Sequence, residues 1–183
     1  MKHSMLWAAP LLSGLMWAQP VKLHVEPAQT EVNYLLGATL HSVHGTFHLK
    51  RGEFTFDPAT GKATGELVVD ATTGNSGNES RDKRMHESIL ETAKYPDIVF
   101  RPDRVDGKVA AAGHSDVQLH GVFTLRGTDH EMMVPLSVDA SGGGYQALAK
   151  FTVPYVKWGV KNPSTLLLRV SDKVEITVKT TAR

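Results

Sequence analysis

The one good helix candidate in this chain is a charged segment that reads Gly77-Asn78-Glu79-Ser80-Arg81-Asp82-Lys83-Arg84-Met85-His86-Glu87-Ser88-Ile89-Leu90. Asn78 or Ser80 can cap its start, because a side-chain oxygen there accepts hydrogen bonds from the free amide groups of the first turn. Met85 and Ile89 lie four residues apart and share an apolar stripe that is expected to face inward. The pair Tyr95-Pro96 is predicted to stop the helix, since the residue before a proline disfavours the α conformation.

The sequence on both sides of this segment alternates between apolar and polar residues with a period of two, from Leu23 onward. Such alternation is typical of strands with one buried face. No βαβ alternation is present, so the sequence predicts an antiparallel sandwich or a closed antiparallel barrel of about eight or nine strands. The alternating runs are 31–34, 42–49, 53–56, 63–70, 98–105, 117–125, 132–138, 145–153 and 174–178.

Small residues recur on the faces expected to point inward. They are Gly45, Gly65, Gly121, Ala147 and Ala149. Small inward residues leave space for a ligand, or let a strand bend at a barrel corner. Tight packing of one sheet on another explains them equally well, so these residues alone do not choose between a barrel and a sandwich.

The N-terminus has the pattern of an export signal. Residues 1–18 combine an early Lys2 with a short apolar run, and Ala18 precedes Gln19-Pro20, which predicts a secretory signal peptide cleaved after Ala18. The remaining residues, 19–183, are long enough for one domain with its own core. They carry 19 basic residues, since Lys2 is removed from the total of 20, against 19 acidic residues. This balance gives no overall electrostatic footprint for nucleic acid or an anionic membrane, and no membrane span is expected after processing.

The sequence offers little for catalysis or metal binding. There is no cysteine, which excludes disulfides, thiolate metal sites and a cysteine nucleophile. No Gly-x-Ser-x-Gly elbow or phosphate-binding glycine loop occurs. His44 and His48 share a strand face but stand too far apart for easy joint chelation, so we expect exposed histidines instead of a metal site. We therefore predict no catalytic residues and no cofactor.

Several motifs, in order along the chain, resemble those of the YceI-like, polyisoprenoid-binding proteins of the bacterial periplasm. Residues 78–82 look like the family's Asn-Glu-x-Arg-Asp segment, and residues 94–100 resemble its Lys-Tyr-Pro-x-Ile-x-Phe segment. Residues 43–47 and 121–128 are similar to its Val-x-Gly-x-Phe strand and its later hairpin. The resemblance implies an all-β, eight-stranded, lipocalin-like antiparallel barrel with the short helix covering one end. It also implies export to the periplasm, an apolar tunnel that holds a long isoprenoid or fatty-acyl chain, and often a homodimer.

These observations lead to one functional hypothesis and two alternatives. The hypothesis is an exported, non-enzymatic protein that sequesters or carries a polyisoprenoid, an isoprenoid quinone or a fatty-acyl lipid. The alternatives are an enzyme acting on a lipid in the same cavity, metal-dependent through His44 or His86, and an adaptor domain whose barrel is filled. The residues expected to line the tunnel are Phe47, Phe54, Phe56, Leu67, Val69, Met85, Ile89, Phe100, Leu119, Phe123, Leu125, Met132, Val134 and Phe151.

Overall fold

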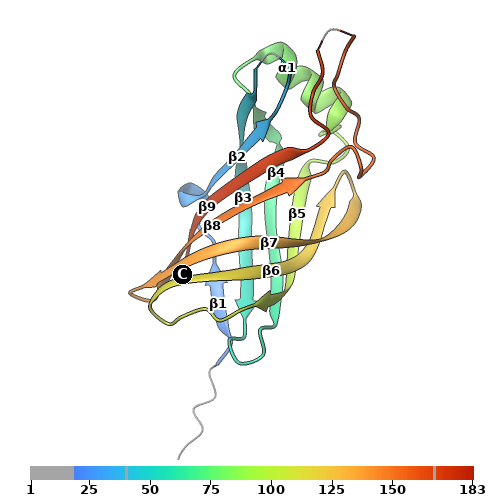
Figure 1. The fold of residues 1–183 in the computed structure, drawn as a ribbon. Coiled ribbons are helices and arrows are strands. Elements are labelled where there is room, and N and C mark those ends of the chain that lie inside the picture. The colour runs from blue at the N-terminus through green and yellow to red at the C-terminus, as the bar shows by residue number, and fades with distance from the viewer. Residues whose placement is uncertain (1–18, 40, 167) are drawn as a thin grey trace, which may run out of the picture.

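A computed structural model describes residues 19–39, 41–166 and 168–183, and the predicted signal peptide lies outside these residues. Within them the chain forms nine strands, a short 3-10 turn and one short helix (Figure 1). The strands are β1 Val21–His24, β2 Glu31–Leu36, β3 Val43–Phe56, β4 Ala63–Asn75, β5 Asp97–Asp106, β6 Gly113–Leu125, β7 Thr128–Ser141, β8 Gly144–Val153 and β9 Val174–Ala182. The 3-10 turn η1 is Pro27–Gln29, and the helix consists of α1 Glu79–Arg84 and η2 Met85–Ile89.

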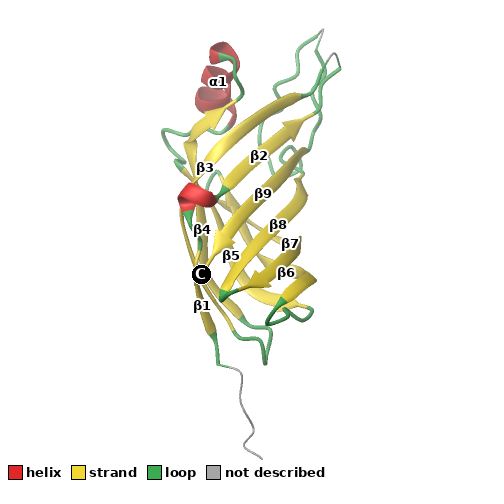
Figure 2. Ribbon diagram, turned by 90° about the vertical axis from the view of Figure 1, so that its left-hand side faces the viewer, coloured by secondary structure: helices red, strands yellow, loops and turns green. Residues whose placement is uncertain are grey.

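Strands β2 to β9 close into an eight-stranded antiparallel barrel. Each strand pairs with the next along the chain, and β9 returns to pair with β2, for example through Val32 and Val178. Strand β1 adds no ninth position to the ring, because it pairs with the end of β3 that β2 leaves free, with Leu23 opposite Phe54. Figure 2 shows the tilted strands wrapping around the axis. The structure thus confirms the barrel and not the sandwich.

The two ends of the barrel differ in the length of their connections. At one end the strands are joined by 37–42, by the helical segment 76–96, by the tight turn 126–127 and by 154–173. Figures 1 and 2 show α1 and the 154–173 connection at this same end. The connections at the other end, 57–62, 107–112 and 142–143, have six residues or fewer, so both long connections, 76–96 and 154–173, lie at the first end. We call the first the helix end and the second the turn end.

The turn end of the barrel is filled by packed side chains. Its main buried cluster consists of Phe56, Ala63, Phe100, Val105, Val117, Leu119, Val134, Val138 and Ala149. Two of the small inward residues make room for aromatic rings. A Cβ atom at Gly45 would lie 2.3 Å from Cζ of Tyr34, and one at Gly121 would lie 2.8 Å from Cζ of Phe100. At these positions the missing side chain is replaced by a neighbouring ring and does not open a void.

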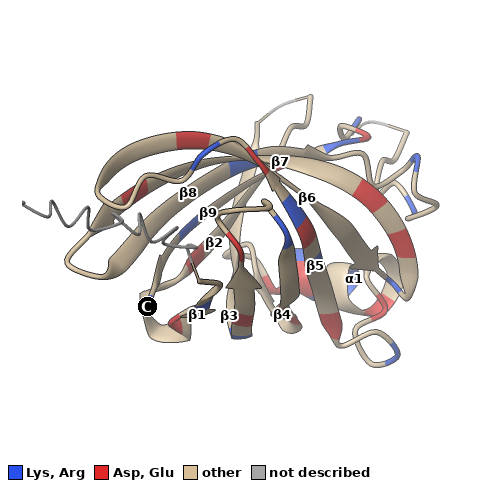
Figure 3. Cartoon of the chain, turned by 90° about the horizontal axis from the view of Figure 1, so that it is seen from below, with Lys and Arg blue, Asp and Glu red and all other residues tan. Residues whose placement is uncertain are grey.

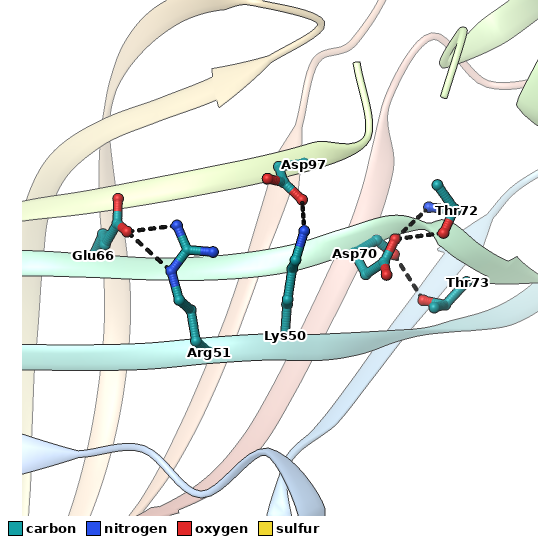
Figure 4. Close-up of polar contacts among 7 residues, drawn as sticks. All are labelled: Lys50, Arg51, Glu66, Asp70, Thr72, Thr73 and Asp97. Carbon is teal, nitrogen blue, oxygen red and sulfur yellow. Dashed lines mark hydrogen bonds and ion pairs between the residues drawn. The ribbon is translucent and has the colours of Figure 1, made fainter. Parts of the chain in front are cut away.

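The outside of the barrel carries both signs of charge, interspersed along the strands (Figure 3). Figure 4 shows one such region, where Lys50 and Arg51 on β3 reach over β4. The Lys50 ammonium lies 2.9 Å from Asp97 on β5, and Arg51 lies 2.7 Å from Glu66 on β4. Val68, which pairs with Arg51, is fully buried although it belongs to the outward-facing set of its strand. The aliphatic stems of the two basic side chains explain this burial, since long cationic side chains cover apolar surface while their charged ends stay in water.

An apolar cavity beneath the helix

A cavity of about 490 Å³ lies at the helix end of the barrel. Its wall comes from the ends of strands that meet the helix and from the 154–173 connection. The apolar side chains that line it are Leu36, Ala38, Val43, Phe47, Met85, Ile89, Leu90, Ile98, Phe123, Leu125, Val153, Val160, Pro163, Leu168, Val170, Val174 and Ile176. The volume lies within the range of roughly 300–1,000 Å³ that is typical of small-ligand pockets.

The helix that covers the cavity is short and changes its winding midway. The Asn78 side-chain oxygen accepts a hydrogen bond of 3.0 Å from the Arg81 amide, which confirms Asn78 as the cap. The first six residues are α-helical, and the next five form a π-helical turn in which the Leu90 amide donates to the Met85 carbonyl at 2.8 Å. Single π-helical turns of this kind occur frequently at functional sites.

The helix ends earlier than the sequence predicts. Glu91 adopts a left-handed conformation with φ of 52°, and its carbonyl accepts hydrogen bonds from the amides of Lys94 and Tyr95. A residue in that conformation reverses the chain, so the expected stop at Tyr95-Pro96 is wrong by several residues. Pro96 instead leads directly into β5.

Met85 and Ile89 point from the helix into the cavity, as the four-residue spacing predicts. Gly74 at the end of β4 gives room to Met85 and Phe47: a Cβ atom there would lie 2.7 Å from Cε of Met85 and 2.6 Å from Cε1 of Phe47. The Tyr34 hydroxyl lies 3.8 Å from the Met85 sulfur and also lines this side of the wall. Met85 and Ile89 therefore form the part of the helix that covers the cavity.

Polar contacts hold the helix at both of its ends. At the start, Arg81 donates to the Ser76 hydroxyl at 2.7 Å and to the Ser76 carbonyl at 3.0 Å. Asp82 accepts from the amide and the hydroxyl of the same serine. Just past the end, Glu91 forms an ion pair with Arg126 in the β6–β7 turn.

Two tyrosines bring hydroxyl groups close to the cavity. The Tyr155 hydroxyl donates to the Ser171 carbonyl at 2.6 Å, and burial raises the pKa of Tyr155 to about 12, with a smaller contribution from the charge of Asp172. The pKa of Tyr34 is also raised, mainly by burial and to a smaller extent by the negative charge of Asp82. Both phenols stay protonated near neutral pH, so neither places a negative charge beside the apolar wall.

The cavity lining includes basic residues and, among the described residues, no aspartate or glutamate. The basic residues are Arg81 and Arg84 from the helix and His41 from the connection between β2 and β3. Arg84 and His41 are exposed, which places them at the rim. The arrangement is an apolar chamber with a basic mouth, suited to an apolar chain held mainly by the area it buries, at about 25 cal/mol per Å² before ordering costs.

The structure places five of the fourteen predicted lining residues around this cavity: Phe47, Met85, Ile89, Phe123 and Leu125. The other nine pack in the turn end and its flank. Phe56, Phe100, Leu119 and Val134 belong to the main buried cluster, Phe54, Leu67, Met132 and Phe151 pack against it, and Val69 packs against the cluster under β1. Whether any of the fourteen contacts a ligand remains a prediction.

Several lining residues were absent from the prediction although their inward orientation was recognisable. Tyr34, Val153, Val174 and Ile176 all lie on apolar faces of alternating runs. Alternation says which side of a strand faces inward but not which end of the barrel a residue occupies. The helix supplies that information, because in an up-and-down barrel the end of one strand and the start of the next meet at the same rim.

The histidines considered for metal binding do not gather at the cavity. His44 and His48 are exposed on the outer face of β3. His86 uses Nε2 to bond the Gly74 carbonyl at 3.0 Å, and its Nδ1 lies 3.4 Å from the Thr92 hydroxyl. Within residues 19–39, 41–166 and 168–183, no three or more His, Asp or Glu side chains cluster so that they could hold a metal ion.

A closed eight-stranded antiparallel barrel with one short helix defines the lipocalin-like class of barrel folds. Within that class the chain belongs to the YceI-like domain family, whose model matches residues 23–182. A relative from Pseudomonas savastanoi pv. phaseolicola, named UPF0312 protein, is 28% identical over 168 residues, which cover 86% of this chain and 85% of that protein.

Two solved structures share the fold at low sequence identity. BcnA of Burkholderia cenocepacia superposes with a TM-score of 0.70 at 17% identity, covering 87% of this chain and 99% of that one. A polyisoprenoid binding domain from Saccharophagus degradans, implicated in plant cell wall breakdown, superposes with a TM-score of 0.63 at 14% identity, covering 88% and 97%. No helix in the described part of the chain is long and apolar enough to cross a membrane.

Proposed function

We propose that this protein binds one long apolar molecule, an isoprenoid or fatty-acyl lipid, in the cavity beneath the helix. The observation that carries the proposal is the cavity itself: about 490 Å³, walled by aliphatic and aromatic side chains, in a barrel whose other end is packed. Membership of the YceI-like family supports it, as does the polyisoprenoid binding named for one structural neighbour. The chain of the lipid lies inside, and its polar end lies at the basic rim formed by His41 and Arg84.

The role we propose is that of an exported carrier without catalytic activity. The pattern of residues 1–18 supports export to the periplasm, where a lipid must cross an aqueous space. An enzyme acting through His44 or His86 has less support. His44 lies on the outer face of β3, and His86 is engaged by Gly74 and does not line the cavity.

Native mass spectrometry of the mature protein, followed by organic extraction, tests the proposal directly. We expect a stoichiometric isoprenoid or fatty-acyl species that leaves on extraction. A mass equal to the bare chain, even after incubation with octaprenyl and fatty-acyl lipids, would contradict the proposal.

A matched pair of variants ties the bound lipid to this cavity. Ile176 lines it, whereas Thr177 follows on the same strand and faces outward, since side chains alternate along a strand. We expect Ile176→Trp to obstruct the chamber and to lose most of the co-purifying lipid while remaining folded. Thr177→Trp adds the same bulk outside and should keep its lipid. Equal loading of the two variants would place the lipid elsewhere.

A further inference from the structure

One leucine beside the cavity is completely exposed. Leu166, in the 154–173 connection, has a relative exposure of 102%, whereas the other large apolar side chain that stands out on the described surface, Met133, reaches 43%. The same connection sends Leu168 and Val170 into the cavity wall. The connection therefore presents Leu166 outward beside the cavity mouth, where exposure of a leucine to water is unfavourable.

The connection that carries Leu166 is basic. Over its whole length the sequence contains four basic residues, Lys157, Lys161, Arg169 and Lys173, against one acidic residue, Asp172. All four basic residues are exposed, and none forms an ion pair with a carboxylate of the described residues. Arg84, at the cavity rim, is likewise exposed and without an ion pair within the described chain. The helix itself carries both signs, so the local excess of positive charge comes from this connection, although the mature chain as a whole is balanced.

We infer that this connection docks on an anionic phospholipid bilayer, with Leu166 inserted among the lipids and Lys157, Lys161 and Arg169 near the headgroups. An apolar side chain flanked by unpaired basic residues matches the interface of an anionic membrane, where burial and charge attraction act together. A second copy of the chain would bring equal positive charges into contact, which disfavours it as the occupant.

The position of the 154–173 connection is also favourable for transfer of the proposed lipid. It is continuous with the cavity mouth, because Leu168 and Val170 belong to both. A mouth held against a bilayer lets an apolar chain move between membrane and barrel without passing through water. This benefit rests on the proposed function, whereas the docking itself rests only on the exposed leucine and the charges.

Co-sedimentation with large unilamellar vesicles tests the inference. We expect binding to vesicles containing phosphatidylglycerol at low salt, little binding to pure phosphatidylcholine vesicles, and weakening as salt rises. Leu166→Asp should reduce the partition coefficient by about tenfold or more. The double change Lys161→Ser with Arg169→Ser should reduce it by about fivefold for each charge removed.

Matched controls separate docking from general surface effects. Met133→Asp introduces the same charge at an exposed apolar residue on the outer face of β7, and Lys62→Ser with Lys108→Ser removes two exposed charges from the turn end. Both controls should bind phosphatidylglycerol vesicles as the wild type does.

Three results would overturn the inference. They are a wild type that stays in the supernatant with every vesicle, a Leu166→Asp variant that binds no more weakly than Met133→Asp, or a wild-type dimer in sedimentation velocity that Leu166→Asp dissociates. The readout needs no bound lipid. If the protein docks on vesicles but never carries lipid, only the carrier proposal is contradicted. If it carries lipid but never docks, only the docking inference is contradicted.

Discussion

At the scale of single residues, the cavity wall depends on one glycine beneath an aromatic ring. Tyr34 is 8% exposed, and its ring lies directly over Gly45 on the neighbouring strand. The Cβ atom of an alanine at position 45 would lie 2.3 Å from Cζ and 2.4 Å from the hydroxyl oxygen of Tyr34. The ring cannot stay where it is, and it cannot move far without disturbing Phe47, whose ring centre is 5.5 Å away.

We therefore expect Gly45→Ala to lower the free energy of unfolding by about 1–3 kcal/mol, the usual cost of overpacking. Urea denaturation measures it. The control is Gly144→Ala, where the added Cβ would meet its nearest atoms at an ordinary 3.7 Å. Adding Tyr34→Leu should recover part of the loss at position 45, because the clashing ring is gone. Equal effects of the two glycine changes would contradict the steric argument.

A second residue-scale prediction concerns Tyr155, which supports the connection that covers the cavity. Its pKa is about 12 in the folded protein against a usual 10.0. As pH rises through this window the unfolded chain loses the phenol proton first, so the contribution of Tyr155 to stability is complete below pH 10 and declines up to about pH 12. We expect Tyr155→Phe to be less stable than the wild type by about 1 kcal/mol near neutral pH, for want of the hydrogen bond to Ser171. That gap should shrink above pH 10 in urea titrations, and a constant gap would contradict the burial of the phenol.

At the scale of elements, the helix is held by a contact between two segments that lie far apart in sequence. Glu91 and Arg126 form an ion pair, and they are also the two residues other than glycine with positive φ in the described chain, at 52° and 49°. The Arg126 guanidinium lies 5.9 Å from the centre of the Tyr95 ring, and its Nε is buried without a partner. Two strained turns thus face each other across one ion pair that fixes the helix cover to the β6–β7 turn.

Breaking that pair should loosen the cover without unfolding the barrel. We expect Glu91→Gln to lower stability by about 1 kcal/mol, because Arg126 keeps its partial burial and loses its counter-charge. Amide hydrogen exchange in residues 79–90 should quicken by about fivefold, while exchange in β6 and β7 changes little. Glu87→Gln makes the same change on an exposed residue of the same helix that has no ion pair in the described chain, and it should leave exchange unaltered. Faster exchange in both variants would show a charge effect and not a specific contact.

Element by element, the sequence predicted most of the structure from local patterns. Alternation located eight of the nine strands, although it divided β3 into the runs 42–49 and 53–56 and gave no run for β1, and the capping rule narrowed the helix cap to Asn78 or Ser80. The alternating pattern groups Val68 with Thr64 and Glu66 on the outward face, yet Val68 is fully buried. Lys50 and Arg51 reach over its strand from β3 (Figure 4). The pre-proline rule at Tyr95-Pro96 placed the end of the helix too late, because Glu91 already turns the chain in a left-handed conformation. Glu91 also pairs with Arg126, which lies 35 residues later, and sequence periodicity contains no information about such long-range contacts.

At the scale of the whole molecule, the barrel divides into a packed half and a hollow half. Phe56 and Val105 belong to the filled turn end, while Phe47 and Ile176 face the chamber. Since the chain has no cysteine, its fold depends on buried clusters such as that of the turn end and not on disulfides. The lining of the hollow end lacks the dispersion contacts that a filled core would give it, and the proposed lipid would supply them.

Together with the proposed lipid binding, this division predicts how the thermal stability of the protein responds to removal of lipid. A ligand at 100 times its dissociation constant stabilises the folded state by about 2.7 kcal/mol, which for a domain of this size is about 5–10 °C in the midpoint of thermal unfolding. We expect the extracted and refolded wild type to melt lower by that amount, and added lipid to restore the midpoint. Ile176→Trp obstructs the chamber and should retain little lipid, so its midpoint should barely change on extraction. Differential scanning calorimetry of both proteins, before and after extraction, measures this difference. If the midpoint of the wild type does not change on extraction, the chamber is stable when empty, and any lipid bound there contributes nothing to the stability of the fold.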